Sequence, residues 1–489
     1  MNRPVGRWDL TLGLEGGSEP LFRRISRAIV AEIQRGRLRP GARLPGSRTL
    51  ARTLRVHRNT VLAAYEELSG EGWTESSRAR GTFVSSAMPE VRRRGGTAAG
   101  SHNRSHVAAG FDFRSALEQR VPDAGAGPAT LLSVGVPDVR LAPTVALARA
   151  FRRVLRDSPA ELLSYGHSQG HPRLRAALAA MLRAARGLTV EPDDVLVTSG
   201  SQMALELVGR TLLAPGDVVA IEQLGYHYAW RVFEQHGAVL APVAVDAGGL
   251  DVEALAQLAE RTALRAVYLT PHHQYPTTAT LSAGRRIALL ELARAKRFAV
   301  IEDDYDHEFH YEGRPVLPMA SADNAGVVLY VGSLAKVLAP GVRLGYLVAP
   351  RSLLREVVAH RACIDRQGEH TLECAVAELF EQGEVQRHAR RARRIYQARR
   401  DCLARALQRE LGSALSFEVP SGGLTLWATA VAGLDVEAWA ARARGQGVVV
   451  YTARQYAYDG RVRPHLRLGF AAFDEAEITA WVKLLKRAL

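Results

Sequence analysis

The sequence predicts two parts: a small helical front part with a helix-turn-helix pattern and a hairpin, and a larger α/β body around a largely parallel sheet. Three observations predict this. Apolar residues recur at helical spacing between residues 21 and 68. Beyond about residue 114, apolar strand-like runs alternate with helical stretches. The chain has 489 residues and a formal charge of +14, and residues 1–110 concentrate that charge, with 19 arginines, no lysine and 9 acidic residues.

Three helices are predicted in the front part. In the first, residues 21–33, apolar side chains recur every four residues, at Leu21, Ile25, Ile29 and Ile33. The second runs over residues 47–54, with Ser47 as a possible cap, and the third over residues 58–68. The turn at 55–57 between them completes the helix-turn-helix pattern, although any small helical hairpin has similar spacing.

A hairpin over residues 74–84 is predicted to act as a wing beside these helices. The residues expected to contact DNA are polar or lie in the wing: Arg48, Arg58, Asn59, Thr60, Arg78, Arg80 and Gly81. The first turn of a recognition helix reaches base edges, where arginine and asparagine pair with guanine and adenine. The other arginines suit phosphates. An arginine-rich proteome would also raise the charge, but it would not concentrate it at one end.

Six apolar runs of the body are predicted strands, at residues 194–200, 217–223, 238–245, 265–271, 298–304 and 327–333. Ligand sites in such sheets lie at the carboxyl ends of the strands. Several polar or aromatic groups lie at these ends or in the segments that follow: Ser199, Gly200, Ser201, Gln202, Tyr226, Tyr275, Asp303, Tyr305, Ser333 and Arg343. Each has an ordinary reading as well, since a serine often only caps a helix, a tyrosine is often core and an acidic loop is often solvated.

Lys336 is the most informative of the residues at the strand ends. Of 64 basic residues only four are lysines, and the other three, Lys296, Lys483 and Lys486, lie on helices where they are expected to face solvent. Apolar neighbours around Lys336 predict partial desolvation, which leaves more neutral amine to attack a carbonyl.

No metal site is predicted. His272 and His273 are adjacent, but neighbours on a strand point to opposite faces, and no third ligand follows at metal spacing. The three cysteines, Cys363, Cys374 and Cys402, show no CxxC spacing, which favours a reduced, cytosolic protein. No run approaches the roughly 18 apolar residues of a membrane span.

Two sets of motifs carry a family resemblance. LPGSRTLA, VHRNTVLAAYEELSGEGW and RGTFV resemble the winged helix of GntR-type bacterial transcription factors. YGHSQGHPRLRAALA, VTSGSQMALEL, HHQYPTTATLS, IEDDYDHEF, GSLAKVLAPGVRLGY and HLRLGF resemble fold-type I aminotransferases. Together they resemble the MocR/GabR-type regulators. The resemblance implies a winged helix over residues 18–86, a flexible linker over 87–113 and an aminotransferase-like effector domain over 114–489, with a smaller C-terminal α+β subdomain.

The same resemblance implies pyridoxal 5′-phosphate as cofactor and a role for each matching residue. Lys336 would form the Schiff base, Asp303 would face the pyridine nitrogen, Tyr305 would bond the 3′ oxygen, and Tyr226 would stack on the ring. The phosphate would be held by a set of polar groups, namely Ser199, Gly200, Ser201, Gln202, Ser333 and Arg343. Arg467 would take the carboxylate of an effector.

One departure from the family pattern concerns the Asn-Pro-Thr-Gly turn. Tyr275 stands in the place of the asparagine and Thr278 in that of the glycine, which removes a polar contact to the cofactor and puts efficient transamination in doubt. The resemblance therefore predicts a cytoplasmic, nucleoid-associated bacterial regulator that senses an amine, an amino acid or the cofactor itself. It would act as a homodimer with exchanged DNA-binding heads on two half-sites. The alternative is an active aminotransferase with an appended DNA-binding domain.

Overall fold

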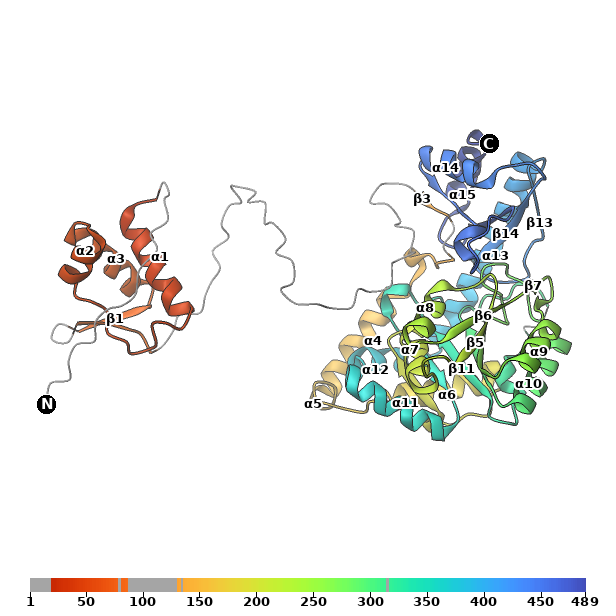
Figure 1. Cartoon of the computed structure of the whole chain (residues 1–489), viewed down its shortest axis with the longest axis horizontal. Coiled ribbons are helices and arrows are strands. Elements are labelled where there is room, and N and C mark those ends of the chain that lie inside the picture. The colour runs from red at the N-terminus through yellow and green to blue at the C-terminus, as the bar shows by residue number, and fades with distance from the viewer. Residues whose placement is uncertain (1–18, 78–80, 87–129, 133–134, 314–315) are drawn as a thin grey trace. The chain divides into compact units, whose positions relative to one another are not determined.

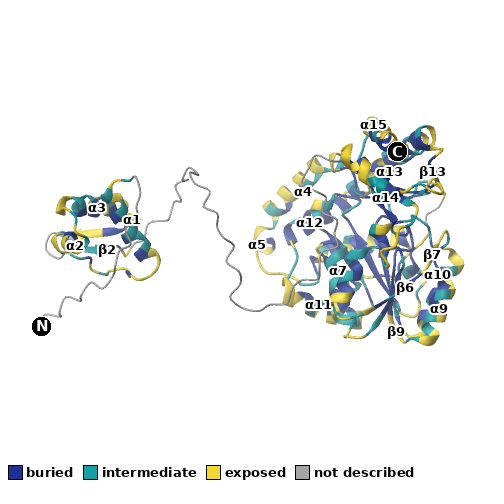
Figure 2. Ribbon diagram, turned by 45° about the horizontal axis from the view of Figure 1, so that its top comes forward, coloured by how far each residue is buried: buried dark blue, intermediate teal, exposed yellow. Residues whose placement is uncertain are grey.

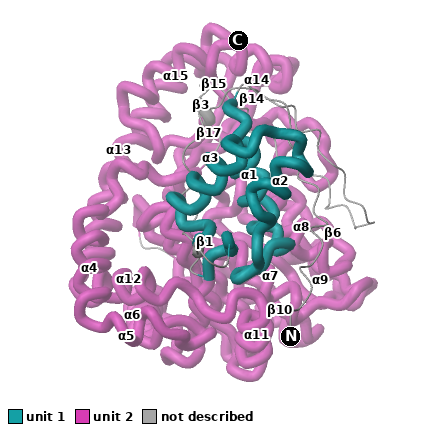
Figure 3. The backbone as a smooth tube through the Cα atoms, turned by 90° about the vertical axis from the view of Figure 1, so that its left-hand side faces the viewer, with its two compact units in different colours: residues 1–113 teal, residues 114–489 magenta. Residues whose placement is uncertain are grey.

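The structure is a computed structural model in which residues 19–77, 81–86, 130–132, 135–313 and 316–489 are described (Figure 1). The chain divides into two compact units, residues 1–113 and residues 114–489, which Figure 3 distinguishes by colour. Most of the predicted linker lies outside the described residues. Within the described part of the chain, no helix combines the length and the apolar character needed to cross a membrane.

Unit 1 consists of three helices and a hairpin, as predicted. Its elements are α1 (Leu21–Gln34), α2 (Ser47–Leu54), α3 (Arg58–Gly70), β1 (Thr74–Ser77) and β2 (Gly81–Val84). The four-residue spacing of α1 buries Ile25, Ile29 and Ile33 against α2 and α3, while Leu21 is only partly buried. The expectation that Ser47 caps α2 is wrong: Gly46 is the N-cap and Ser47 is the first helical residue.

The connection between α2 and α3 has a defined geometry. Arg55 ends α2 in the left-handed region, at φ 54°, and His57 caps α3 by accepting a hydrogen bond from the Asn59 amide. These two residues reverse the chain within three positions, so the start of α3 is held beside α2. Four positions of α3 face inward and are buried: Val61, Ala64, Tyr65 and Leu68.

The large sheet of unit 2 contains the six predicted strands. Within the described residues its seven strands lie in the order β4 (Val195–Thr198), β12 (Gly345–Val348), β11 (Val328–Ser333), β10 (Ala299–Asp304), β9 (Leu264–Leu269), β5 (Val218–Glu222) and β6 (Val239–Val243). All of these strands are parallel to one another except β12, which pairs antiparallel with both neighbours and was not predicted.

Helices cover both faces of this sheet, and its strands form the buried centre in Figure 2. On one face lie α7 (Ser201–Leu212), α8 (His227–Gln235) and α11 (Arg351–Ile364). The other face is covered by α4 (Thr144–Asp157), α5 (Pro159–Leu162), α6 (Pro172–Arg186), α9 (Val252–Arg261), α10 (Ala283–Lys296) and α12 (His370–Glu381). Burial on both sides explains why the strands are apolar without alternation.

A smaller α+β subdomain completes unit 2, as predicted. Its antiparallel sheet has the order β13 (Leu415–Phe417), β14 (Thr425–Ala430), β17 (His465–Gly469) and β16 (Tyr451–Thr452). Three helices pack on it: α13 (Glu384–Leu411), α14 (Val436–Gly445) and α15 (Glu475–Arg487). Two small ladders, β3 (Thr130–Leu131) with β15 (Val448–Val449) and β7 (Val245–Asp246) with β8 (Gly249–Leu250), lie beside the main sheets. Arg467 on β17 of this subdomain contacts Tyr275, which follows β9 at the carboxyl edge of the large sheet.

Candidate cofactor site and DNA-binding surface

Lys336 lies after β11, between the buried residues Leu334 and Val337. Its Nζ donates a hydrogen bond to the carbonyl oxygen of Gly135 at 2.8 Å. Burial, and then the charge of Arg467, lower the pKa of the lysine to about 8. The amine is therefore held by a neutral acceptor and is neutral in a substantial fraction of molecules near physiological pH. The other three lysines differ: Lys296 and Lys486, for example, pair with glutamates at 2.8 and 3.0 Å.

Asp303, near the end of the neighbouring strand β10, carries an unsatisfied carboxylate oxygen. The Tyr268 hydroxyl donates to its Oδ2 at 2.9 Å, whereas Oδ1 is buried with no hydrogen-bond partner among the described residues. Burial raises the pKa of Asp303 to about 7. A buried acceptor of this kind needs a donor, and the protonated nitrogen of a pyridine ring supplies one. Tyr268, the aromatic residue of β9, was not predicted to take part.

The N-terminus of α7 and the residues around it form a candidate phosphate cradle. Gly200, at φ 84°, is the N-cap, and Arg343 donates to the Ser199 carbonyl at 2.9 Å. A Cβ at position 200 would lie 3.0 Å from the Arg343 guanidinium, so glycine allows the arginine to lie over this turn. First-turn amides together with a guanidinium are suited to a phosphate dianion.

Two further residues predicted to hold the phosphate form hydrogen bonds within the protein. Ser333 is buried at the end of β11, and its Oγ accepts from the Ala335 amide at 3.2 Å. Gln202 donates to the Tyr228 carbonyl at 3.2 Å, and its Oε1 is buried without a partner among the described residues. Ser201 is the first residue of α7. Their roles toward a phosphate stay predictions.

Tyrosines enclose the other side of the site. The ring of Tyr275 meets those of Tyr226 and Tyr305 edge to face, at centroid distances of 5.4 and 6.1 Å. The Tyr305 hydroxyl donates to the His273 carbonyl at 3.0 Å. The structure thus brings the predicted stacking residue and the predicted phenol into contact with the same tyrosine ring.

Tyr275 also packs its ring against the guanidinium of Arg467. The sequence did not predict this contact. The guanidinium carbon of Arg467 lies 4.1 Å from the centre of the Tyr275 ring and 5.7 Å from that of Tyr456. Arg467 is buried and also hydrogen-bonds Tyr456. The tyrosine that replaces the family's asparagine therefore holds the arginine expected to bind a carboxylate. Thr278, in place of the glycine, still adopts the left-handed conformation, at φ 65°.

In unit 1 the residues predicted to contact DNA lie around the start of α3. Arg48, Arg58 and Asn59 are exposed, and Thr60 is half-buried. Arg58 Nε donates to Ser47 Oγ at 3.4 Å, which links the two helices at this surface.

The wing residues are only partly described. Gly81 begins β2 at φ 104°, whereas Arg78 and Arg80 lie outside the described residues. Arg43, which was not predicted, lies beside the wing, where its backbone forms an isolated antiparallel β-bridge with Phe83. A Cβ placed on Gly81 would lie 3.3 Å from the Nε of Arg43. The position of Arg43 in the connection between α1 and α2 gave no periodic signal in the sequence.

Family comparisons agree with this geometry. Residues 21–84 match bacterial regulatory proteins of the gntR family, and residues 128–485 match aminotransferase class I and II. The chain is 31% identical to the probable rhizopine catabolism regulatory protein MocR of Rhizobium meliloti, covering 96% of this chain and 94% of that one. It is also 31% identical to the transcriptional regulator TauR of Rhodobacter capsulatus, covering 97% of each.

Among solved structures, unit 2 resembles aminotransferases. The α-aminoadipate aminotransferase LysN of Thermus thermophilus, complexed with N-(5′-phosphopyridoxyl)-L-leucine, has a TM-score of 0.69 and 30% identity. The match covers 74% of this chain and 92% of LysN. The kynurenine aminotransferase of Pyrococcus horikoshii has a TM-score of 0.70 and 28% identity, over 74% of this chain and 91% of that one. The residues described above fit the same cofactor, because the buried Asp303 oxygen, the glycine-bordered cradle and the lysine each meet one of its groups.

Proposed function

Because the chain belongs to the MocR-type regulators, in which a GntR-type winged helix precedes an aminotransferase class I and II domain, we propose that it controls transcription in response to a small amine. Unit 1 binds DNA, and unit 2 binds pyridoxal phosphate. The effector is an amine, an amino acid or the cofactor itself. The protein acts in the bacterial cytoplasm, on the nucleoid when bound to DNA.

The observation that carries this proposal is the state of Lys336. Its amine donates to a carbonyl oxygen and has a pKa of about 8. The same site contains the buried carboxylate of Asp303, whose Oδ1 has no hydrogen-bond partner among the described residues. When bound, pyridoxal phosphate supplies an aldehyde that condenses with amines. Lys336 is the residue of this chain suited to hold it, since a guanidinium stays protonated and does not condense.

The remaining residues divide the recognition of cofactor and effector between them. Asp303 accepts from the ring nitrogen, and Tyr226 packs against the ring. The amides of Ser201 and Gln202, with Arg343, bind the phosphate. Arg467 binds an effector carboxylate through its planar fork, which Tyr275 keeps oriented.

A spectral experiment tests the cofactor part of the proposal. Wild-type protein with pyridoxal phosphate is expected to show the absorbance of a lysine-bound cofactor, which shifts when the correct amine is added from a panel of amines and amino acids. Lys336→Ala removes this absorbance, whereas Lys296→Ala, at a lysine paired with Glu260, retains it. Persistence of the absorbance in Lys336→Ala contradicts the assignment.

DNA binding is tested separately. The wild-type protein is expected to bind promoter fragments, and Arg58→Ala is expected to bind them about 5–160-fold more weakly, with the cofactor absorbance of that variant unchanged. We also propose a homodimer with exchanged DNA-binding heads that binds two half-sites, an expectation carried by the family resemblance. Light scattering that gives the mass of a single chain in solution contradicts it.

An aminotransferase activity is the second candidate. It is favoured by the presence of Lys336, Asp303, Tyr305 and Arg467 in one site and by the likeness of unit 2 to solved aminotransferases. It is disfavoured by Tyr275, whose ring packs against Arg467 where the family pattern has an asparagine. Rapid turnover of an amino acid with a 2-oxo acid would support this second function.

A further inference from the structure

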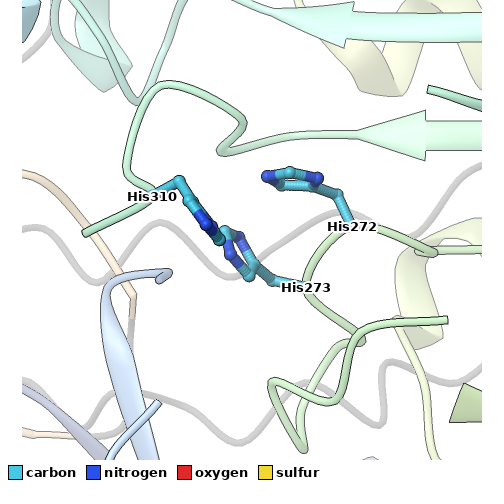
Figure 4. Close-up of side chains that lie close together, drawn as sticks. All are labelled: His272, His273 and His310. Atoms are coloured by element: carbon cyan, nitrogen blue, oxygen red, sulfur yellow. The ribbon is translucent and has the colours of Figure 1, made fainter. Parts of the chain in front are cut away.

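Four histidines gather beside the cofactor site, on two loops at the carboxyl edge of the large sheet. His272 and His273 follow β9, and His307 and His310 follow β10. The first three are almost fully buried, and His310 is half-buried. Figure 4 shows that His310 approaches His273 end to end, with His272 beside them. The proposed function makes no use of these imidazoles.

Three of the rings are close enough to share a ligand. The ring centroid of His272 lies 4.3 Å from that of His273 and 5.9 Å from that of His310, and those of His273 and His310 are 6.3 Å apart. One ring nitrogen from each of the three lies within 4.8 Å of the others. The sequence-based expectation that the adjacent histidines point apart is thus not met, because they lie on a loop rather than a strand, and the third ring comes from the next loop.

Four ring nitrogens of these three histidines lack a protein hydrogen-bond partner among the described residues. Both ring nitrogens of His272, Nε2 of His273 and Nδ1 of His310 are buried without a hydrogen-bond partner among the described residues. Buried polar atoms of a folded protein are normally satisfied. Several unsatisfied nitrogens facing a common volume indicate a ligand that accepts lone pairs.

A carboxylate orients one of the rings. Asp306 Oδ1 lies 2.7 Å from His273 Nδ1, and both residues are buried. A carboxylate in this position fixes the proton on Nδ1 and leaves Nε2 as the ligand atom, an arrangement that usually accompanies metal-bound histidine.

A second grouping, His272 with Asp304 and His307, is less suitable. The rings of His272 and His307 are stacked, with centroids 4.3 Å apart and planes at 17°, so their nitrogens lie side by side instead of converging. Asp304 Oδ2 already accepts from Tyr330 at 2.6 Å and contacts His307 at 2.8 Å. This pair supports the cluster from one side and is not its ligand set.

We infer that His272, His273 and His310 form a binding site for a divalent transition metal ion of the zinc type. Neutral imidazoles suit zinc, and three of them leave a fourth position for water or another ligand. Bonds of 2.0–2.1 Å bring tetrahedral ligands to about 3.4 Å from one another, so binding draws the loop with His310 toward the loop with His272.

The place of the site gives the ion a structural role between the two parts of unit 2. His310 bridges to Gly422 in the smaller subdomain, and the Gly423 amide donates to the Phe309 carbonyl at 2.8 Å. The ion would therefore link the loop after β9 to the loop after β10. Backbone contacts in turn join the loop after β10 to the Gly422 segment. This inference does not depend on the transcriptional role proposed above.

The test uses full-length protein carrying pyridoxal phosphate, stripped of metal by a chelator and freed of excess cofactor. Zinc chloride is titrated against a chromophoric chelator, and bound metal is counted by mass spectrometry. Wild type is expected to bind one zinc per chain and no magnesium, which prefers oxygen ligands. His360→Asn, on α11 outside the cluster, is expected to bind equally.

His310→Asn is expected to lose the zinc while it retains its circular dichroism and cofactor absorbance. Asp306→Asn, which keeps the side-chain shape, is expected to bind about 10–100-fold more weakly. Wild-type protein that takes up no zinc overturns the inference. Zinc uptake that is unchanged in both variants also overturns the inference. The same holds if zinc uptake is lost only when the exposed thiol of Cys363 is blocked.

Discussion

Replacing Arg467 with methionine tests whether the surroundings of Lys336 prepare its amine for condensation. The pKa of Lys336 falls from 10.5 to about 8, first because burial disfavours the ammonium form and next because of the Arg467 charge. This difference of roughly 2.5 units raises the neutral fraction at pH 7 about 300-fold. Burial is the larger cause, so removing the guanidinium should raise the pKa by at most about one unit and lower that fraction up to about tenfold.

The assay measures how fast cofactor-free protein acquires the absorbance of bound pyridoxal phosphate between about pH 6 and pH 10. Only the neutral amine condenses, so the wild-type rate should rise through a midpoint near pH 8. Arg467→Met should move this midpoint to higher pH, with a rate ratio of up to about ten at pH 7 that vanishes near pH 10. Arg461→Met, at an exposed residue of the preceding loop, is the control. A wild-type midpoint near 10.5, or an unchanged profile in Arg467→Met, would refute the reasoning.

Three more predictions follow from the same sites. Asp303 holds its proton up to about pH 7 when folded but only to about 3.8 when unfolded, so cofactor-free protein should lose stability as pH rises between these values. Asp303→Asn should remove this loss, about 2–3 kcal/mol between pH 5 and pH 8, in urea unfolding compared at those two pH values; equal pH dependence in both proteins would contradict this. Tyr275→Leu should weaken binding of carboxylate-bearing effectors about 2–30-fold in a spectral titration, because the ring contact to Arg467 is lost, whereas Tyr275→Phe should change it little. Arg58→Ala should relax base preference at one operator position by about 1–3 kcal/mol, while Arg48→Ala should weaken all sequences alike and lower the salt slope by about one.

Much of the fold could be predicted because its signals are local. The four-residue apolar spacing of α1 and the unbroken apolar runs of the six parallel strands reflect burial that each segment undergoes by itself. Strand β12 could not be predicted in the same way. Gly345–Val348 has four residues, and its place between β4 and β11 depends on pairings with segments far along the chain.

The same distinction between local signals and long-range contacts applies to the residues of the candidate site. Asp303 lies near the end of β10, the Ser199–Gln202 turn follows β4 and Lys336 lies shortly after β11, and the parallel arrangement brings these strand ends together. Tyr268 beneath Asp303 and Gly135 beside Lys336 could not be found from spacing, because each acts through one hydrogen bond across the fold. The histidine cluster was missed for a related reason, since His310 reaches His273 only through the path of the loop after β10.

The antiparallel strand β12 has a consequence for ligand fit. Because β12 returns directly beside β11, the connection between them begins and ends at the same edge of the sheet, and both Lys336 and Arg343 lie on it. A single short tether therefore sets the span between the group that would capture an aldehyde and the group that would grip a phosphate. Inserting or deleting one residue between these two positions would change that span against a molecule of fixed length, and no repacking of the helices would restore it.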